Sequence, residues 1–173
     1  MTEITLNKLK VFIWSNRFHA ILVCFVLTLS IVLRLYQFVE PQYPERWRQL
    51  TWPDYSQEYV IANHIVTYGE FPMNGPGYLL GIEWVSPLYY YLVSGILLIH
   101  NDIIFLSLFN VFLQILSLLG VYALARILFG KGTGLIALTL FGLSNAIIWQ
   151  SYIIWQPHVM QPFIILSYIL LAL

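Results

Sequence analysis

Two carboxylates, Asp54 and Glu58, stand four residues apart at the start of a helix-like stretch that runs to Tyr68. Residues with this spacing share one face of a helix, so we expect the two side chains to lie together. Such a pair could position a general base or bind a cation. A simpler interpretation is also open, in which Asp54 and Gln57 form a capping box and Glu58 belongs to a solvated face.

Arg34 and His158 are the other charged or titratable side chains placed where chemistry could occur. Arg34 lies near the end of the apolar run 18–38, where a charge is costly unless it snorkels or finds a partner. It therefore either reaches headgroup phosphates or helps to hold the phosphate of a lipid substrate. His158 lies in a turn at 149–161 that is rich in aromatic and polar residues. It either caps the return of the chain into the membrane or faces a substrate.

Tyr89 belongs to a segment, Ser86 to Tyr91, that reads as the start of a helix, with Ser at the cap and Pro87 at the first helical position. Its tyrosines fit an aromatic belt at headgroup level. They also fit the wall of a groove for a sugar or a prenyl chain. The sequence contains no His/Cys/Asp cluster with zinc-site spacing and no phosphate-binding glycine loop, so no metal ligands are predicted.

The composition indicates that lipid is the solvent for most of this chain. Of its 173 residues 60% are hydrophobic and 9% are charged, whereas an average soluble domain is about 25% charged. A soluble fold could not bury so much apolar surface. The net charge of zero argues against a nucleic-acid partner. Cys24, the single cysteine, excludes a disulfide within one chain.

Apolar runs separated by polar segments predict an all-α, polytopic membrane protein. The predicted order is a cytoplasmic N-terminal segment at 1–17, a transmembrane helix at 18–38, a long outer loop with juxtamembrane helices at 39–102, and further transmembrane helices at about 103–127, 134–153 and from 158 within the segment 103–173. Seven of the eight acids lie between Glu40 and Asp102, within or at the end of that outer loop.

The sidedness depends on the apolar run 87–99, which is short for a membrane span and is read as a juxtamembrane helix. Arg126 and Lys131 then fall on the inner side, as the positive-inside rule prefers. The loop 39–102 and the turn 149–161 fall on the outer side. Leu173 ends the chain inside an apolar run, so we expect a fragment of a longer protein in the plasma membrane.

The order and spacing of several residues resemble membrane glycosyltransferases with the GT-C fold, and most closely the family 39-like enzymes that include protein O-mannosyltransferases and aminoarabinose transferases. The resemblance covers about residues 20–173. It is carried by Arg34, Asp54, Gly69-Glu70-Phe71-Pro72, the segment from Ser86 to Leu92, His100-Asn101-Asp102, the inner turn from Tyr122 to Gly130, and the outer turn from Tyr152 to Pro157.

This resemblance implies an inverting transfer of a sugar from a polyprenyl phosphate to a hydroxyl of a lipid, protein or glycan. Asp54 would be the general base and Arg34 would stabilise the leaving phosphate. Tyr55 and Gln57 stand where many relatives carry an acidic and a basic residue, and Gln156 stands where Asp or Asn is common. The donor and the use of a divalent cation as cofactor therefore stay open.

Two other classes of function compete with an enzyme. A transporter or flippase would need ionisable groups within the bundle, but the later helices offer only Asn110, Gln114 and Asn145 at depth. A non-catalytic membrane module that binds lipid or partners would fit a natural four-helix protein. The enzyme is the leading hypothesis, with Asp54 as its catalytic residue and Arg34, Glu58, Tyr89 and His158 as its substrate-binding residues.

Overall fold

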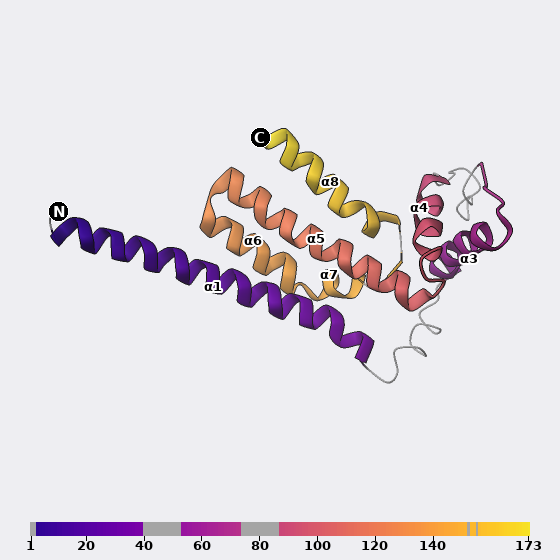
Figure 1. The fold of residues 1–173 in the computed structure, drawn as a ribbon, viewed down its shortest axis with the longest axis horizontal. Helices are drawn as coiled ribbons and strands as arrows, with labels where there is room; N and C mark the ends of the chain where they lie inside the picture. The colour runs from indigo at the N-terminus through magenta and orange to yellow at the C-terminus, as the bar shows by residue number, and fades with distance from the viewer. Residues whose placement is uncertain (1–2, 40–52, 74–86, 152, 155) are drawn as a thin grey trace.

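The computed structural model describes residues 3–39, 53–73, 87–151, 153–154 and 156–173, and every regular element in these ranges is an α-helix. The helices are α1 (Glu3–Val39), α3 (Pro53–Tyr68), α4 (Pro87–Leu97), α5 (Ile103–Phe129), α6 (Lys131–Leu143), α7 (Asn145–Gln150) and α8 (Gln156–Ala172). Figure 1 shows them as a bundle of α1, α5, α6 and α8, with the pair α3 and α4 at one end. The expected all-α class is confirmed for this part of the chain.

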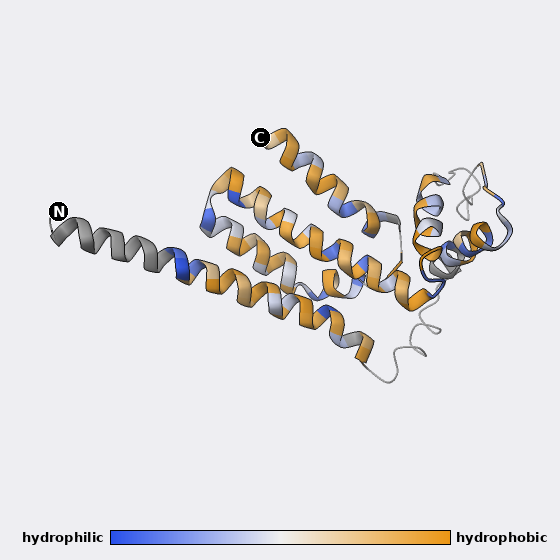
Figure 2. Ribbon diagram, viewed as in Figure 1, coloured by the Kyte–Doolittle hydropathy of each residue, from blue (hydrophilic) through white to orange (hydrophobic). Residues whose placement is uncertain are grey.

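Two of the described helices are long and apolar enough to cross a membrane. They are Asn16–Tyr36 within α1 and the whole of α5, Ile103–Phe129. Apolar residues dominate both segments in Figure 2, and large side chains such as Ile21 and Phe25 are exposed on α1. Exposed apolar surface of this kind is what lipid chains cover. α1 also begins well before the apolar run 18–38, because neither glycine nor proline interrupts it from Glu3 onward.

α5 is the central helix of the bundle and packs against α6 on one side and α8 on another. The contact with α8 is close at Gly120, where an added Cβ would lie 2.7 Å from Cγ2 of Ile165. Small residues at such crossings let two helix backbones approach. α1 packs against α6 and α7, and α3 packs against α4. The bundle therefore rests on one internal helix with its neighbours around it.

Helix termini follow local signals. Gly69 has φ +69° and donates its N–H to the Ile65 carbonyl at 2.9 Å, which ends α3 as its sequence predicts. Asp102 caps α5, because its carboxylate accepts from the N–H groups of Ile104 and Phe105. Gly130, with φ +90°, reverses the chain between α5 and α6.

The predicted helix at 134–153 is interrupted. α6 ends at Leu143, Ser144 has an extended backbone with ψ 119°, and the short α7 follows. A single continuous span was therefore the wrong expectation for this segment. The break matters for the site, because the carbonyl groups at the end of a helix must find donors outside it.

The two segments expected on the outer side do lie at one end of the bundle. The end of the bundle at which α5 begins also holds α3, α4, α7 and the first turn of α8 (Figure 1). The Gly130 turn lies at the opposite end. One apolar cluster joins them, with Ala62 from α3, Tyr90 from α4, and Ile154 and Val159 from the turn before α8 and its first residues. These segments, far apart in sequence, thus share one core.

Candidate functional site

Asp54 is the second residue of α3, Pro53–Tyr68. It therefore lies in the first helical turn rather than at a cap before it, which removes the capping box as drawn from the sequence. Its side chain lies outside the described part of the structure. The helical register still places Asp54 on the same face as Glu58, one turn further along α3.

Glu58 is buried, with 6% of its surface exposed, so the alternative in which it belongs to a solvated face is excluded. The hydroxyl of Tyr89 donates a hydrogen bond to Oε2 of Glu58 and so ties α4 to α3. Tyr89 is itself only 1% exposed, which excludes an aromatic belt at headgroup level for this ring. A buried carboxylate needs such donors, because water no longer solvates it. The Glu58–Tyr89 pair is thus a structural link as well as a predicted substrate-binding pair.

Tyr59 stands next to this pair on a more polar edge of α3. Its hydroxyl donates to Oδ1 of Asn101 at 3.3 Å, and Nδ2 of Asn101 donates to Oδ1 of Asn63 at 2.7 Å. Burial, followed by the negative charge of Asp102, raises the pKa of Tyr59 above its usual 10.0. The phenol is therefore a donor throughout the physiological range and holds the loop before α5 against α3.

Arg34 is fully buried, so it does not snorkel to headgroups. Its Nη1 donates to the Gly142 carbonyl at 2.9 Å and to the Ser30 carbonyl at 3.1 Å, and it also bonds to Oγ of Ser30. Oγ of Ser30 donates to the same Gly142 carbonyl at 3.0 Å. These donors come from α1 and satisfy a carbonyl that the break after Leu143 leaves open. Arg34 and Ser30 therefore stabilise the end of α6 at its break from α7.

The other edge of the Arg34 guanidinium is unpaired. Nε and Nη2 are both buried without a hydrogen-bond partner in the structure. These two N–H groups lie in the guanidinium plane, point to the same side of the group along one edge, and form the fork that binds carboxylate or phosphate bidentately. A buried charge with unsatisfied donors is costly. The arrangement is therefore suited chemically to an oxyanion.

His158 lies in the interior, with 4% of its surface exposed, rather than on the polar rim that the simpler sequence interpretation favoured. Its Nδ1 lies 3.2 Å from the Ile153 carbonyl oxygen, and its own carbonyl accepts from Nε2 of Gln114 at 2.9 Å. Val159, the next residue, belongs to the same apolar cluster as Tyr89. The structure thus places His158 beside the core that supports the Glu58–Tyr89 pair, whereas Arg34 contacts Ser30 and Gly142 on α1 and α6.

Asn110 and Gln114 have a larger role than their sequence positions suggested. Nδ2 of Asn110 donates to the carbonyls of Ser151 and Ile153, both at 2.8 Å, and so fixes the non-helical turn between α7 and α8. Buried carbonyl groups outside a regular helix require such internal partners. The available signal was a polar stripe on an otherwise apolar helix, at Ser107, Asn110, Gln114 and Ser117, all of which are buried.

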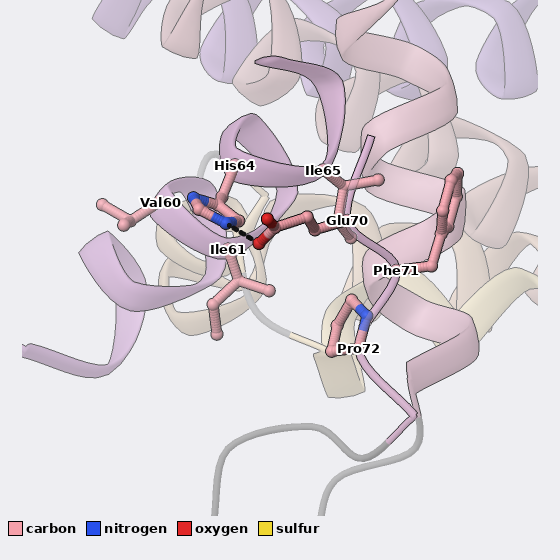
Figure 3. A pocket seen from close by; sticks show the side chains of 7 residues that line it. All are labelled: Val60, Ile61, His64, Ile65, Glu70, Phe71 and Pro72. Carbon is pink, nitrogen blue, oxygen red and sulfur yellow. Dashed lines mark hydrogen bonds and ion pairs between the residues drawn. The ribbon is translucent and has the colours of Figure 1, made fainter. Parts of the chain in front are cut away.

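A cleft opens beside α3 and is shown in Figure 3. Nε2 of His64 lies 2.9 Å from Oε2 of Glu70 at its rim. His64 is six residues beyond Glu58, which is roughly 240° around the helix, so the His64–Glu70 rim of the cleft faces away from Glu58. Ile61 and Ile65, which also line the cleft, lie three and seven residues beyond Glu58 and so share its face of α3. The cleft has a volume of about 470 Å³ and is lined by Val60, Ile61, His64, Ile65, Glu70, Phe71 and Pro72.

No protein-family model, no curated protein and no solved structure matches this chain. Within the described ranges, no three His, Cys, Asp or Glu side chains are grouped so that they could hold a metal ion. The side chain of Asp54 lies outside those ranges, so a divalent cation at that carboxylate stays a hypothesis.

Proposed function

We propose that this chain is the membrane-embedded N-terminal part of a glycosyltransferase of the GT-C type. It would move a sugar from a polyprenyl phosphate to an acceptor hydroxyl at the outer face of the plasma membrane. The observation that carries the proposal is the buried Arg34, whose Nε and Nη2 lack partners. A leaving phosphate is the group that this guanidinium edge would match.

The proposed reaction uses the α3 carboxylate at position 54 as general base. The acceptor O–H gives its proton to Asp54 while its oxygen attacks the anomeric carbon. The new C–O bond forms as the bond to the phosphate oxygen breaks, and the configuration inverts. The phosphate leaves with the bonding pair, and Arg34 stabilises its charge. Glu58, Tyr89 and His158 would shape the site from the apolar cluster that joins α3, α4 and the turn before α8.

The proposed sidedness draws support from the distribution of charge. Arg126 and Lys131 lie at the Gly130 end of the bundle, whereas the described carboxylates Glu58, Glu70 and Asp102 lie in α3, after it and before α5. Cytoplasmic loops carry an excess of Lys and Arg. On this basis α3 and α4 belong to the outer side, where polyprenyl-linked sugars would be used.

The polar stripe of α5 supports a transporter less well than its residue types suggest. The amide donors of Asn110 and Gln114 are used by backbone carbonyls of the turn at 151–158. They therefore have a structural role, and an ion-coupling role would need further ionisable groups.

The test uses the full-length protein and a transfer assay with radiolabelled polyprenyl-phosphate sugars. Asp54→Asn should abolish transfer, by about 10²-fold or more, because the amide cannot accept the proton. Glu70→Gln, at the rim of the cleft that faces away from Glu58, is the matched control and should leave transfer unchanged. Normal transfer by Asp54→Asn would eliminate Asp54 as the base, and transfer of no polyprenyl-linked sugar by the wild type would refute the proposed function.

A further inference from the structure

The end of the bundle opposite α3 and α4 gathers positive charge from three helices. Arg17 lies on α1, Arg126 lies in the last turn of α5, and Lys131 begins α6, and all three are exposed. Nζ of Lys131 donates to Oδ1 of Asn16 at 2.6 Å. This bond brings the start of α6 beside α1 next to Arg17, and Tyr122, which contacts both Arg126 and His19, brings the end of α5 to the same part of α1.

No described carboxylate balances these charges. The carboxylates whose side chains the structure describes are Glu58, Glu70 and Asp102, all in or near α3, α4 and the start of α5. None of the three cations forms an ion pair in the described part of the chain. The cationic end therefore carries a net positive potential that an external anion would satisfy.

Aromatic and apolar side chains lie beside Arg126 at the end of α5. The hydroxyl of Tyr122 accepts from Nη1 of Arg126 at 3.0 Å and lies 3.2 Å from Nε2 of His19 on α1, which fixes the Arg126 side chain against the α1–α5 seam. Leu128 is 52% exposed and Phe129 is 71% exposed beside it. A ligand that fits must therefore combine a negative headgroup with apolar chains.

We propose that this cationic end, defined by Arg17, Arg126 and Lys131, is a binding site for an anionic phospholipid. The lipid phosphate lies among the three cations, and the acyl chains run along the exposed apolar faces of α1 and α5. Basic residues next to membrane spans attract anionic headgroups, whereas zwitterionic lipids gain little there. The inference is independent of the proposed transfer chemistry and requires only that α1 and α5 stand in a bilayer.

The test is a lipid titration of the full chain in detergent, read by native mass spectrometry, with phosphatidylglycerol and phosphatidylcholine as the two probes. Phosphatidylglycerol should bind more tightly, and Arg126→Gln/Lys131→Gln should weaken its binding by about 30-fold, since each cation contributes about fivefold. The charge-preserving variant Arg126→Lys/Lys131→Arg should retain most of the preference. Equal binding of the two lipids by the wild type would overturn the proposal.

A second variant keeps the test decisive if the double substitution disturbs folding. Arg17 is exposed and forms no ion pair in the described part of the chain. Arg17→Gln should therefore leave the helical circular-dichroism signal intact and still weaken the binding of phosphatidylglycerol by about fivefold. An unchanged lipid preference in both Gln variants would place the lipid elsewhere. If inorganic phosphate displaced the lipid at the same concentration, the site would be a simple anion site, and the proposed phospholipid site would also be refuted.

Discussion

The link between Tyr89 and Glu58 gives the sharpest test of how α3 and α4 are held together. Tyr89→Phe removes the hydroxyl that donates to the buried carboxylate and leaves the ring in place. Hydrogen bonds to charged groups contribute about 1.5–3 kcal/mol. We therefore expect the substitution to destabilise the α3–α4 pair by about 2 kcal/mol.

Hydrogen–deuterium exchange in detergent measures this loss where it occurs. A change of about 2 kcal/mol in a local opening equilibrium corresponds to roughly 30-fold faster exchange of the α3 and α4 amides. The amides of α6 serve as an internal reference, because α6 packs against α1 and α5 rather than α3. Faster exchange should therefore be confined to α3 and α4.

Tyr91→Phe is the matched control. The Tyr91 hydroxyl donates to the neutral Pro72 carbonyl at 2.5 Å, so its loss should cost about 1 kcal/mol and accelerate exchange only about fivefold. Glu58→Gln combined with Tyr89→Phe should cost less than the two single changes added together, because both single changes weaken the same hydrogen bond. Unaltered α3 exchange in Tyr89→Phe, or full additivity in the double variant, would refute the reasoning.

Two further predictions concern packing and pH. Gly142→Ala places a Cβ 3.2 Å from Oγ of Ser30, so it should destabilise the bundle by about 1–3 kcal/mol in thermal unfolding. The control Gly95→Ala, whose added Cβ has nothing within 4 Å, should be neutral or slightly stabilising. Similar melting temperatures for the two variants would contradict the close approach at Gly142. The pKa of Tyr59 is raised, so its contribution to stability should be complete below pH 10.0 and lost as the pH rises through the folded-state pKa. Ultraviolet difference spectra of wild type against Tyr59→Phe should show this phenolate forming later than that of free tyrosine, and formation at or below pH 10.0 would contradict the shift.

Much of the helical framework follows from local sequence. The apolar run within α1, the start of α4 at Pro87, the start of α5 after Asp102 and the end of α3 at Gly69 were all predictable. Each depends on residues within a turn or two of the boundary, through apolar length, a capping side chain, or a glycine that tolerates positive φ.

The site residues depended on contacts that no local pattern contains. Arg34 pairs with the Gly142 carbonyl across 108 positions, and this contact supports a helix break that composition alone did not indicate. The sequence left open whether Glu58 belongs to a site or to a solvated face, and only the packing of α4 on α3 buries it against Tyr89. Sequence determined which segments are helical and apolar, because those properties are local. The tertiary structure decided which polar groups are buried and what satisfies them, because desolvation depends on neighbours that the chain brings together only on folding.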